Sequence, residues 1–475
     1  MKSLSPARAL TVALLVSVPG GHGIANGLPA STATGICPAY AFGRELPNAF
    51  VGTPRGNLQL FARTAAASTQ SVDQPAAPQW KRLQLQVDPL DAEGLLVRDP
   101  EAKPGLAARS LPELTADDRL VFETTDFGAR LASPAETKKF SCQSGRPHLL
   151  HELSAPDGTT GNRVYAYLVS CPAEGRTTDT LGEAAVVHDQ KARTITSGTF
   201  SYKYLPTNQL LFEEIRVRRA LTGGQEESTL AASAASLLLR LDVRNFLTLE
   251  FDNSDVESYV EATRHGDLGI VGQINFYMRL LVFKVNLKMA TVASFYRSSA
   301  NIPAIIDVPV NAPRRLRPGS GMIYSYNLDS TRLDATGETH PVHVYDAARI
   351  RKGWQATAEL GLRTCNGTQT CVYRLGGDVA GERFGLEMGI DRSLVERGFF
   401  PMLVHDSEQF AIDVGWEKER KTNGPPRTAM YFETSGLPKG KHRMDYWIRV
   451  GGTGAGKCPA EFRHEGLVTA VGTAH

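Results

Sequence analysis

The feature that most constrains the fold is a recurring alternation of apolar and polar side chains. In residues 237–251, Leu239, Leu241 and Val243 alternate with charged neighbours, and residues 283–289 repeat the pattern. Because successive side chains of a strand point to opposite faces, such segments predict strands with one buried and one solvated face. The same reasoning predicts strands within residues 80–88, 119–123, 164–169, 200–204, 215–218, 322–326, 411–416, 430–433 and 446–450.

Sustained helical periodicity is hard to find, and only residues 391–398 predict a short helix. Many short strands separated by Gly, Pro and Asn turns favour an all-β chain built from β-sandwich domains. Pro172 and the polar stretch 175–180 indicate a domain boundary. We therefore predict a signal peptide over 1–25, a small N-terminal β-sandwich over 26–172, a central β-rich domain over 173–318 and a C-terminal β-sandwich over 319–475, or one large sandwich over 173–475.

The N-terminus predicts export. Lys2 and Arg8 precede an apolar stretch at residues 9–18, and this stretch is too short to span a bilayer. A Pro-Gly-Gly break follows, and Gly23-Ile24-Ala25 provides small residues for cleavage. We expect a secreted protein, periplasmic or extracellular, with no transmembrane segment after cleavage.

The charge of the chain argues against two classes of partner. The sequence has 52 Lys and Arg against 50 Asp and Glu, and removing Lys2 and Arg8 leaves 50 against 50. A balanced chain produces no overall field that would recruit nucleic acid or an anionic membrane surface. We expect no nucleic-acid partner.

Six cysteines remain after the predicted cleavage, and an even number in an exported chain favours disulfides. Cys365 and Cys371 flank a turn containing Asn-Gly, so they could face each other across a hairpin. Cys142 and Cys171 bracket one hairpin-sized segment and form the second predicted pair, which leaves Cys37 for Cys458 by elimination. No close Cys-x-x-Cys pair exists, so we predict no zinc site.

No catalytic or cofactor-binding residue can be assigned. The chain lacks the Gly-x-Ser-x-Gly, His-Glu-x-x-His and phosphate-loop motifs, and the Gly-rich residues 451–457 have no Ser or Thr after Lys457. We predict no cofactor and no metal ligand. Trp354 lies beside Arg351 and Lys352 in a loop-like segment, and it is our candidate for stacking on a ligand.

Two segments between residues 83 and 128 carry a resemblance. Gln86-Val87-Asp88 ends the first predicted strand, and Asp118-Arg119-Leu120-Val121-Phe122 contains the next. This pattern resembles uncharacterised exported bacterial β-rich proteins that carry a Gln-Val-Asp strand followed by an Asp-x-Leu-Val-Phe strand. The resemblance implies an exported β-rich protein and no established activity.

Three classes of function remain open. The first is a non-catalytic binding or interaction protein of the bacterial envelope, with glycans or an envelope protein as its partner. The second is a carbohydrate-active lyase or hydrolase on a large β-sandwich, and the third is a structural component of a surface assembly. A flat aromatic strip would favour the binding protein, whereas two carboxylates in a cleft or a His–Tyr–Arg cluster would favour the enzyme. Long unpaired edge strands would favour assembly.

Overall fold

The structure is a computed structural model, and it describes most of the predicted strands. The described residues are 38–64, 79–92, 94–97, 113–131, 142, 149–156, 162–171, 186–220, 226–244, 248–280, 283–308, 311–328, 343–344, 348, 370–379, 382–404, 409–410, 413, 416, 428–452 and 463–464. They form mostly β-sheet, arranged in several largely antiparallel sheets. The prediction of an all-β sandwich fold is therefore confirmed.

The first part of the chain, together with one short strand from residues 463–464, forms what we call the N-terminal module, which has two sheets. The three-stranded sheet has the order β1 (Pro38–Phe42), β5 (Arg119–Glu123) and β4 (Gln86–Asp88). The five-stranded sheet has the order β25 (Arg463–His464), β6 (Leu149–Pro156), β7 (Arg163–Ser170), β2 (Leu58–Thr64) and β3 (Gln79–Leu83). Buried apolar side chains from both sheets, Leu60, Leu120, Phe122 and Leu168 among them, share one core.

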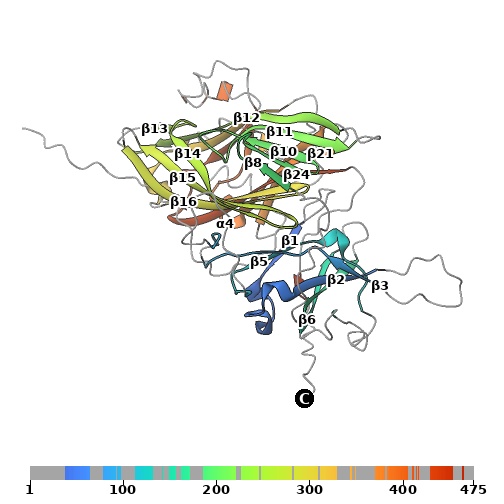
Figure 1. Cartoon of the computed structure of the whole chain (residues 1–475). Coiled ribbons are helices and arrows are strands. Elements are labelled where there is room, and N and C mark those ends of the chain that lie inside the picture. The colour runs from blue at the N-terminus through green and yellow to red at the C-terminus, as the bar shows by residue number, and fades with distance from the viewer. Residues whose placement is uncertain are drawn as a thin grey trace, which may run out of the picture.

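The remaining strands form what we call the large sandwich, which lies above the N-terminal module in Figure 1. Its ten-stranded sheet has the order β19 (His343–Val344), β22 (Met402–Val404), β23 (Thr428–Glu433), β18 (Gly321–Leu328), β12 (Glu226–Asp242), β11 (Phe212–Ala220), β10 (Phe200–Tyr204), β9 (Thr194–Ser197) and β8 (Val186–Asp189), with β13 (Thr248–Phe251) paired to β12. Its seven-stranded sheet has the order β14 (Val256–His265), β15 (Gly269–Leu280), β16 (Phe283–Tyr296), β17 (Ser299–Val308), β24 (Gly440–Gly452), β21 (Glu382–Asp391) and β20 (Thr370–Val379).

The inner faces of these two sheets pack into the main hydrophobic core. Tyr202 of β10 contacts Phe295 of β16 across the core, with ring centroids 5.4 Å apart. In each sheet, strands from before and after residue 318 are direct neighbours, because β12 pairs with β18 and β17 pairs with β24. The predicted domain bounds at 172 and 318 stay predictions.

Two local predictions need correction, and one is met. The alternating segment 80–88 is not one strand, because the chain leaves β3 after Leu83 and enters a different sheet as β4. Residues 411–416 were expected to form a strand, but the described Gln409, Phe410 and Asp413 are helical, and the Gln409 amide donates to Asp413 one turn later. The short helix α4 (Arg392–Val395) lies within the predicted helical segment, and α1 (Ala312–Arg315) was not predicted.

The disulfide prediction is confirmed for one pair. Cys142 and Cys171 are joined, and both are buried beside Tyr167 in the N-terminal module. Cys371 is also disulfide-bonded, while Cys365, Cys37 and Cys458 lie outside the described residues. Within the described part of the chain, no helix has both the length and the apolar character needed to cross a membrane.

Candidate functional site

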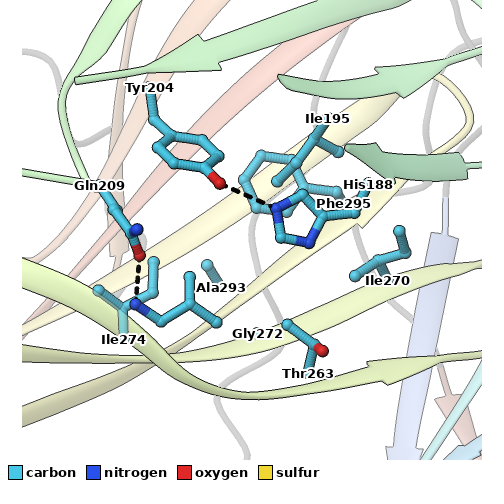
Figure 2. A pocket seen from close by; sticks show the side chains of 11 residues that line it. His188, Ile195, Tyr204, Gln209, Thr263, Ile270, Gly272, Ile274, Ala293 and Phe295 are labelled. Carbon is cyan, nitrogen blue, oxygen red and sulfur yellow. Dashed lines mark hydrogen bonds between the residues drawn. The ribbon is translucent and has the colours of Figure 1, made fainter. Parts of the chain in front are cut away.

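A small cavity lies between the two sheets of the large sandwich, near the edge formed by β8, β9 and β10. Its polar lining groups include His188, Tyr204 and Gln209, and its remaining walls are mainly apolar side chains of β9, β14, β15 and β16. Figure 2 shows His188 and Tyr204 pointing toward each other, and the histidine Nε2 lies 3.0 Å from the tyrosine Oη. The Gln209 side-chain oxygen accepts a hydrogen bond from the backbone N–H of Val260.

The cavity cannot hold a substrate of the size of a sugar. Its volume is about 20 Å³, which is room for about one water molecule and far less than the several hundred Å³ of a typical ligand pocket. Burial lowers the pKa of His188, and nearby His265 lowers it further, whereas burial raises the pKa of Tyr204. Both shifts favour the uncharged forms of the two side chains.

An arginine lies close to this pair but does not complete a catalytic cluster. Arg193 donates from Nη1 to the backbone carbonyl of Tyr204, at 3.1 Å, and pairs through Nη2 with Glu213, also at 3.1 Å. Its charge lowers the pKa of Tyr204, but the effect of burial is larger. The guanidinium is engaged by these two partners, and Arg193 does not line the cavity.

A second polar group of residues joins the N-terminal module to the outer face of the seven-stranded sheet, which is the face directed away from the ten-stranded sheet. Arg119 donates two hydrogen bonds to Asp88 Oδ2, at 3.1 and 2.9 Å, and one to Ser294 Oγ of β16, at 2.9 Å. Gln86 donates to Asp88 Oδ1 at 2.7 Å and accepts from the backbone N–H groups of Leu268 and Gly269. We call Gln86, Asp88, Arg119 and Ser294 the inter-module cluster.

All four side chains of the inter-module cluster are buried, and both oxygens of Asp88 are engaged. A buried ion pair whose hydrogen-bonding groups are engaged in this way fixes geometry and leaves little capacity for a ligand. A Cβ atom at Gly266 would collide with the Gln86 side chain, so the close approach of the two modules requires glycine there. We therefore assign the cluster a structural role.

Apolar contacts extend this coverage along the outer face. Leu90 and Leu96 of the N-terminal module pack with Ala262, Val271 and Val292 of β14, β15 and β16. Gln273 lies between Ala262 and Val292 in the strand register and is fully buried. These contacts define the covered half of the outer face.

The other end of the same face is open and carries two aromatic rings. Tyr259 of β14 is 39% exposed. Its ring stacks on Tyr277 of β15, with centroids 5.2 Å apart and planes 13° apart, and their hydroxyl groups are hydrogen-bonded. The register places Tyr259 opposite Asn275 and Glu257 opposite Tyr277, so these four side chains share one face. We call Tyr259 and Tyr277 the tyrosine pair.

Polar side chains connect the tyrosine pair to the covered half. Glu261 lies in the β-bulge of β14, and its Oε2 accepts hydrogen bonds from the side-chain amides of Gln273, at 3.3 Å, and Asn275. The open half thus combines one exposed and one half-buried ring with amide and carboxylate groups. Aromatic rings can contact the C–H faces of sugars, and such polar groups can bind sugar hydroxyls.

The edge of the sheet next to this surface is covered. Loop residues 207–209 lie along β14, where the Ser258 N–H donates to the carbonyl of Thr207 and the Val260 N–H donates to Gln209. Asn208 is buried and accepts from the Ser258 hydroxyl at 2.7 Å. Because these contacts use backbone groups of β14, this part of the edge is blocked against strand addition.

The predicted stacking residue and the exposed rings are different residues. Trp354 lies outside the described residues and stays a prediction. Trp416 and Trp447 are buried, the latter under the guanidinium of Arg449 at 4.5 Å. The sequence did hold a signal for Tyr259: it occupies the polar side of a period-two segment, between Glu257 and Glu261, where an aromatic ring faces solvent.

No family model matches the chain, and no significant match exists among curated proteins. The function must therefore be argued from the side chains themselves.

Proposed function

We propose that this chain is an exported, non-catalytic glycan-binding protein of the bacterial envelope, with the tyrosine pair as its binding platform. The observation that carries the proposal is the pair of stacked rings, one of them 39% exposed, on the open half of a sheet face. The apolar C–H surface of a sugar ring packs well against such an aromatic surface. Amide and carboxylate groups beside the rings can bind sugar hydroxyls.

Several features favour binding over catalysis. The cavity beside His188 and Tyr204 is far smaller than a sugar ring. The Oε2 atom of Glu261 already accepts hydrogen bonds from the side-chain amides of Gln273 and Asn275, so this oxygen is engaged within the sheet face. The covered edge of β14 also argues against assembly through that strand.

Export is part of the same proposal. The buried disulfide between Cys142 and Cys171 supports an oxidising compartment, because cytosolic thiols are kept reduced. The apolar segment 9–18 and the small residues at 23–25 support secretion through a cleaved signal peptide. An envelope location would place the tyrosine pair where surface glycans are abundant.

Sedimentation with insoluble polysaccharides tests the proposal. The intact protein, the double variant Tyr259→Ala/Tyr277→Ala and the control Leu230→Ala are incubated with cellulose and with chitin. Leu230 is a suitable control because it is also 39% exposed and lies on β12 of the other sheet. We expect the intact protein to bind, and we expect the double variant to bind at least about 10-fold more weakly, because each aromatic contact contributes on the order of 1 kcal/mol or more. Binding by the control variant should be unchanged.

Two results would contradict the proposal. Binding to glycans that is unchanged in the double variant would exclude the tyrosine pair as the platform. New reducing ends or unsaturated products released from the polysaccharide would identify an enzyme instead.

A further inference from the structure

We propose that the junction between the two modules holds a second carbohydrate subsite, in which Tyr40, Asp391 and Arg443 bind the hydroxyl groups of one sugar unit. This inference rests on the proposed function, because it adds a second part to the surface that takes the same glycan. It uses residues other than the tyrosine pair, so the two assignments can fail separately. We call Tyr40, Asp391 and Arg443 the junction site.

The three residues of the junction site come from three strands of both modules. Met444, next to Arg443 on β24, belongs to the main core, so Arg443 points to the outer face of the seven-stranded sheet. Asp391 is the last residue of β21, and the antiparallel register with β24 places it across from Arg443 on that face. Tyr40 belongs to β1, which lies on the side of the N-terminal module nearest to the large sandwich (Figure 1).

The guanidinium of Arg443 is held in place and is accessible. It donates from Nε to Asp445 Oδ2 at 3.0 Å and from Nη2 to Asp445 Oδ1 at 2.9 Å. This two-point pairing leaves the Nη1 group without a hydrogen-bond partner among the described residues, and 52% of the Arg443 side chain is exposed. A planar donor held by a carboxylate in this way presents its remaining N–H bonds in a fixed direction.

Asp391 provides an acceptor that the fold does not use. An Asp directly before a helix usually accepts a hydrogen bond from the helix backbone, but the Asp391 side chain makes no such bond with α4 and has no other hydrogen-bond partner in the described part of the chain. Burial raises the pKa of this carboxyl, and Asp445 raises it further, against the smaller opposite effects of Arg443 and His442. A hydroxyl group that donates to Asp391 would supply the hydrogen bond that its ionised form lacks.

Tyr40 contributes a hydroxyl group from the other module. Burial raises its pKa, while the charge of Arg443 lowers it and that of Asp445 raises it. Because charges shift a pKa mainly from nearby, the hydroxyl lies close to this ion pair. Its uncharged form can both donate and accept a hydrogen bond, and no described residue forms one with it.

The junction site combines donors and acceptors, which favours a hydroxylated ligand. Arg443 only donates, the ionised Asp391 only accepts, and Tyr40 does either. A sulfate or phosphate offers only acceptors and would meet the carboxylates of Asp391 and Asp445, whereas an ammonium group offers only donors and would meet the guanidinium. Neighbouring hydroxyls of one sugar unit satisfy both kinds of group, because each hydroxyl donates and accepts.

One glycan chain is able to contact the tyrosine pair and the junction site together. Both lie on the outer face of the seven-stranded sheet, where β16 and β17 separate β15 from β24. The strand register places Asn275, which lies beside the tyrosine pair, and Arg443 at the same level along the sheet. Three strand spacings amount to about 14 Å, a distance that a tetrasaccharide spans and a disaccharide does not.

Calorimetric titration of the full-length mature protein tests the inference. The probes are neutral β-1,4-linked dimers and tetramers of glucose and of N-acetylglucosamine. We expect a tetramer to bind at least about 10-fold more tightly than its dimer, because its second contact forms within the same complex. Tyr40→Phe and Asp391→Ala should each weaken tetramer binding about 5- to 10-fold, the loss expected for one hydrogen bond, and should leave dimer binding to the tyrosine pair unchanged.

The matched control is Glu396→Ala. Glu396 is an acidic residue that directly follows α4, and its side chain is 49% exposed. Its replacement should leave the affinity for the tetramer unchanged. Thermal melts of each variant verify that it is folded.

The outcomes separate this inference from the proposed function. If a tetramer binds no more tightly than its dimer, or if Tyr40→Phe and Asp391→Ala leave its affinity unchanged, the junction site is wrongly assigned, and the proposed function stands where Tyr259→Ala/Tyr277→Ala abolishes binding. Binding of inorganic sulfate that is lost in Arg443→Ala would assign the junction site to an anion instead. If no oligosaccharide binds and cellulose and chitin also fail to sediment the protein, the glycan-binding function itself is wrong.

Discussion

The two halves of the outer face of the seven-stranded sheet are built from the same strands but use polar groups in opposite ways. In the covered half, Asp88, Arg119 and Ser294 are buried, and Arg119 donates to Asp88 and, across the module boundary, to Ser294. In the open half, Tyr259 is exposed beside Asn275. The difference shows that a row of polar residues on a sheet is not by itself a binding site. Polar residues that are buried and hydrogen-bonded to each other stabilise the fold, whereas an exposed aromatic ring is available to contact a ligand.

The largest expected effect is on the covered half. Arg119→Ala removes one partner of a buried ion pair and leaves the Asp88 carboxylate uncompensated, so the free energy of unfolding should fall by about 3–5 kcal/mol. Urea denaturation measures this change. The matched control is Arg44→Ala, because the pair of Arg44 with Asp117 is about one-third exposed on both sides, and surface pairs contribute about 1 kcal/mol or less. Equal losses in the two variants would contradict the structural role of the cluster.

The next effect depends on pH. Burial, assisted by Asp126, raises the pKa of Glu123 from 4.5 to about 7. A raised pKa means that the folded state binds the proton more tightly than the unfolded state, so the stability from this group is lost as pH rises from about 4.5 to about 7. Glu123→Gln removes that loss, and it should stabilise the protein by about 1–3 kcal/mol at pH 8 and by almost nothing at pH 4.

Thermal melts of Glu123→Gln at the two pH values measure this difference. Glu227→Gln is the control, since Glu227 is exposed on β12. A gain for Glu123→Gln of the same size at pH 4 and pH 8 would show that ionisation of this carboxyl does not limit stability.

A smaller effect is expected at the contact between modules. Gln86→Ala removes the acceptor of the Leu268 and Gly269 N–H groups and one donor to Asp88. Buried groups left without partners cost about 1–3 kcal/mol in total when water replaces part of the lost contact. Hydrogen exchange should accelerate at Leu268 and Gly269 first. Unchanged exchange at these two amides would indicate that the modules are not held together there.

The smallest effect on stability is expected in the open half. Tyr259→Ala removes a partly exposed ring together with its contacts to Tyr277, and it should lower the free energy of unfolding by about 1 kcal/mol. Chemical denaturation measures this value, and Leu230→Ala provides a comparison at equal exposure. A loss above about 2 kcal/mol would show that Tyr259 stabilises the fold, as the buried residues of the covered half do.

The sequence predicted local structure better than it predicted arrangement. The alternation in residues 119–123 predicted β5 with its observed bounds, because a single strand can be predicted from the pattern of its own residues. The same pattern could not show that the chain changes sheets after Leu83, since alternation does not specify a partner strand. Pairings such as β17 with β24 join segments far apart in the chain and were not predictable.

The candidate site was missed for a related reason. The sequence favoured Trp354 as the stacking residue because its neighbourhood is loop-like. The exposure of Tyr259 depends on where the N-terminal module stops covering the sheet, and that boundary is set by tertiary contacts of Leu90 and Leu96. Stacking on Tyr277 depends in turn on the register of β14 with β15.

Hydrogen exchange of the mature protein with and without a saturating neutral β-1,4-linked tetramer tests the central claim most directly. Binding at the tyrosine pair should slow exchange in β14 and β15 and leave the amides around His188 and Tyr204 unchanged. Slower exchange confined to β8, β9 and β10, or no change anywhere in the protein at saturating tetramer, would contradict the assignment of the open half as the binding surface.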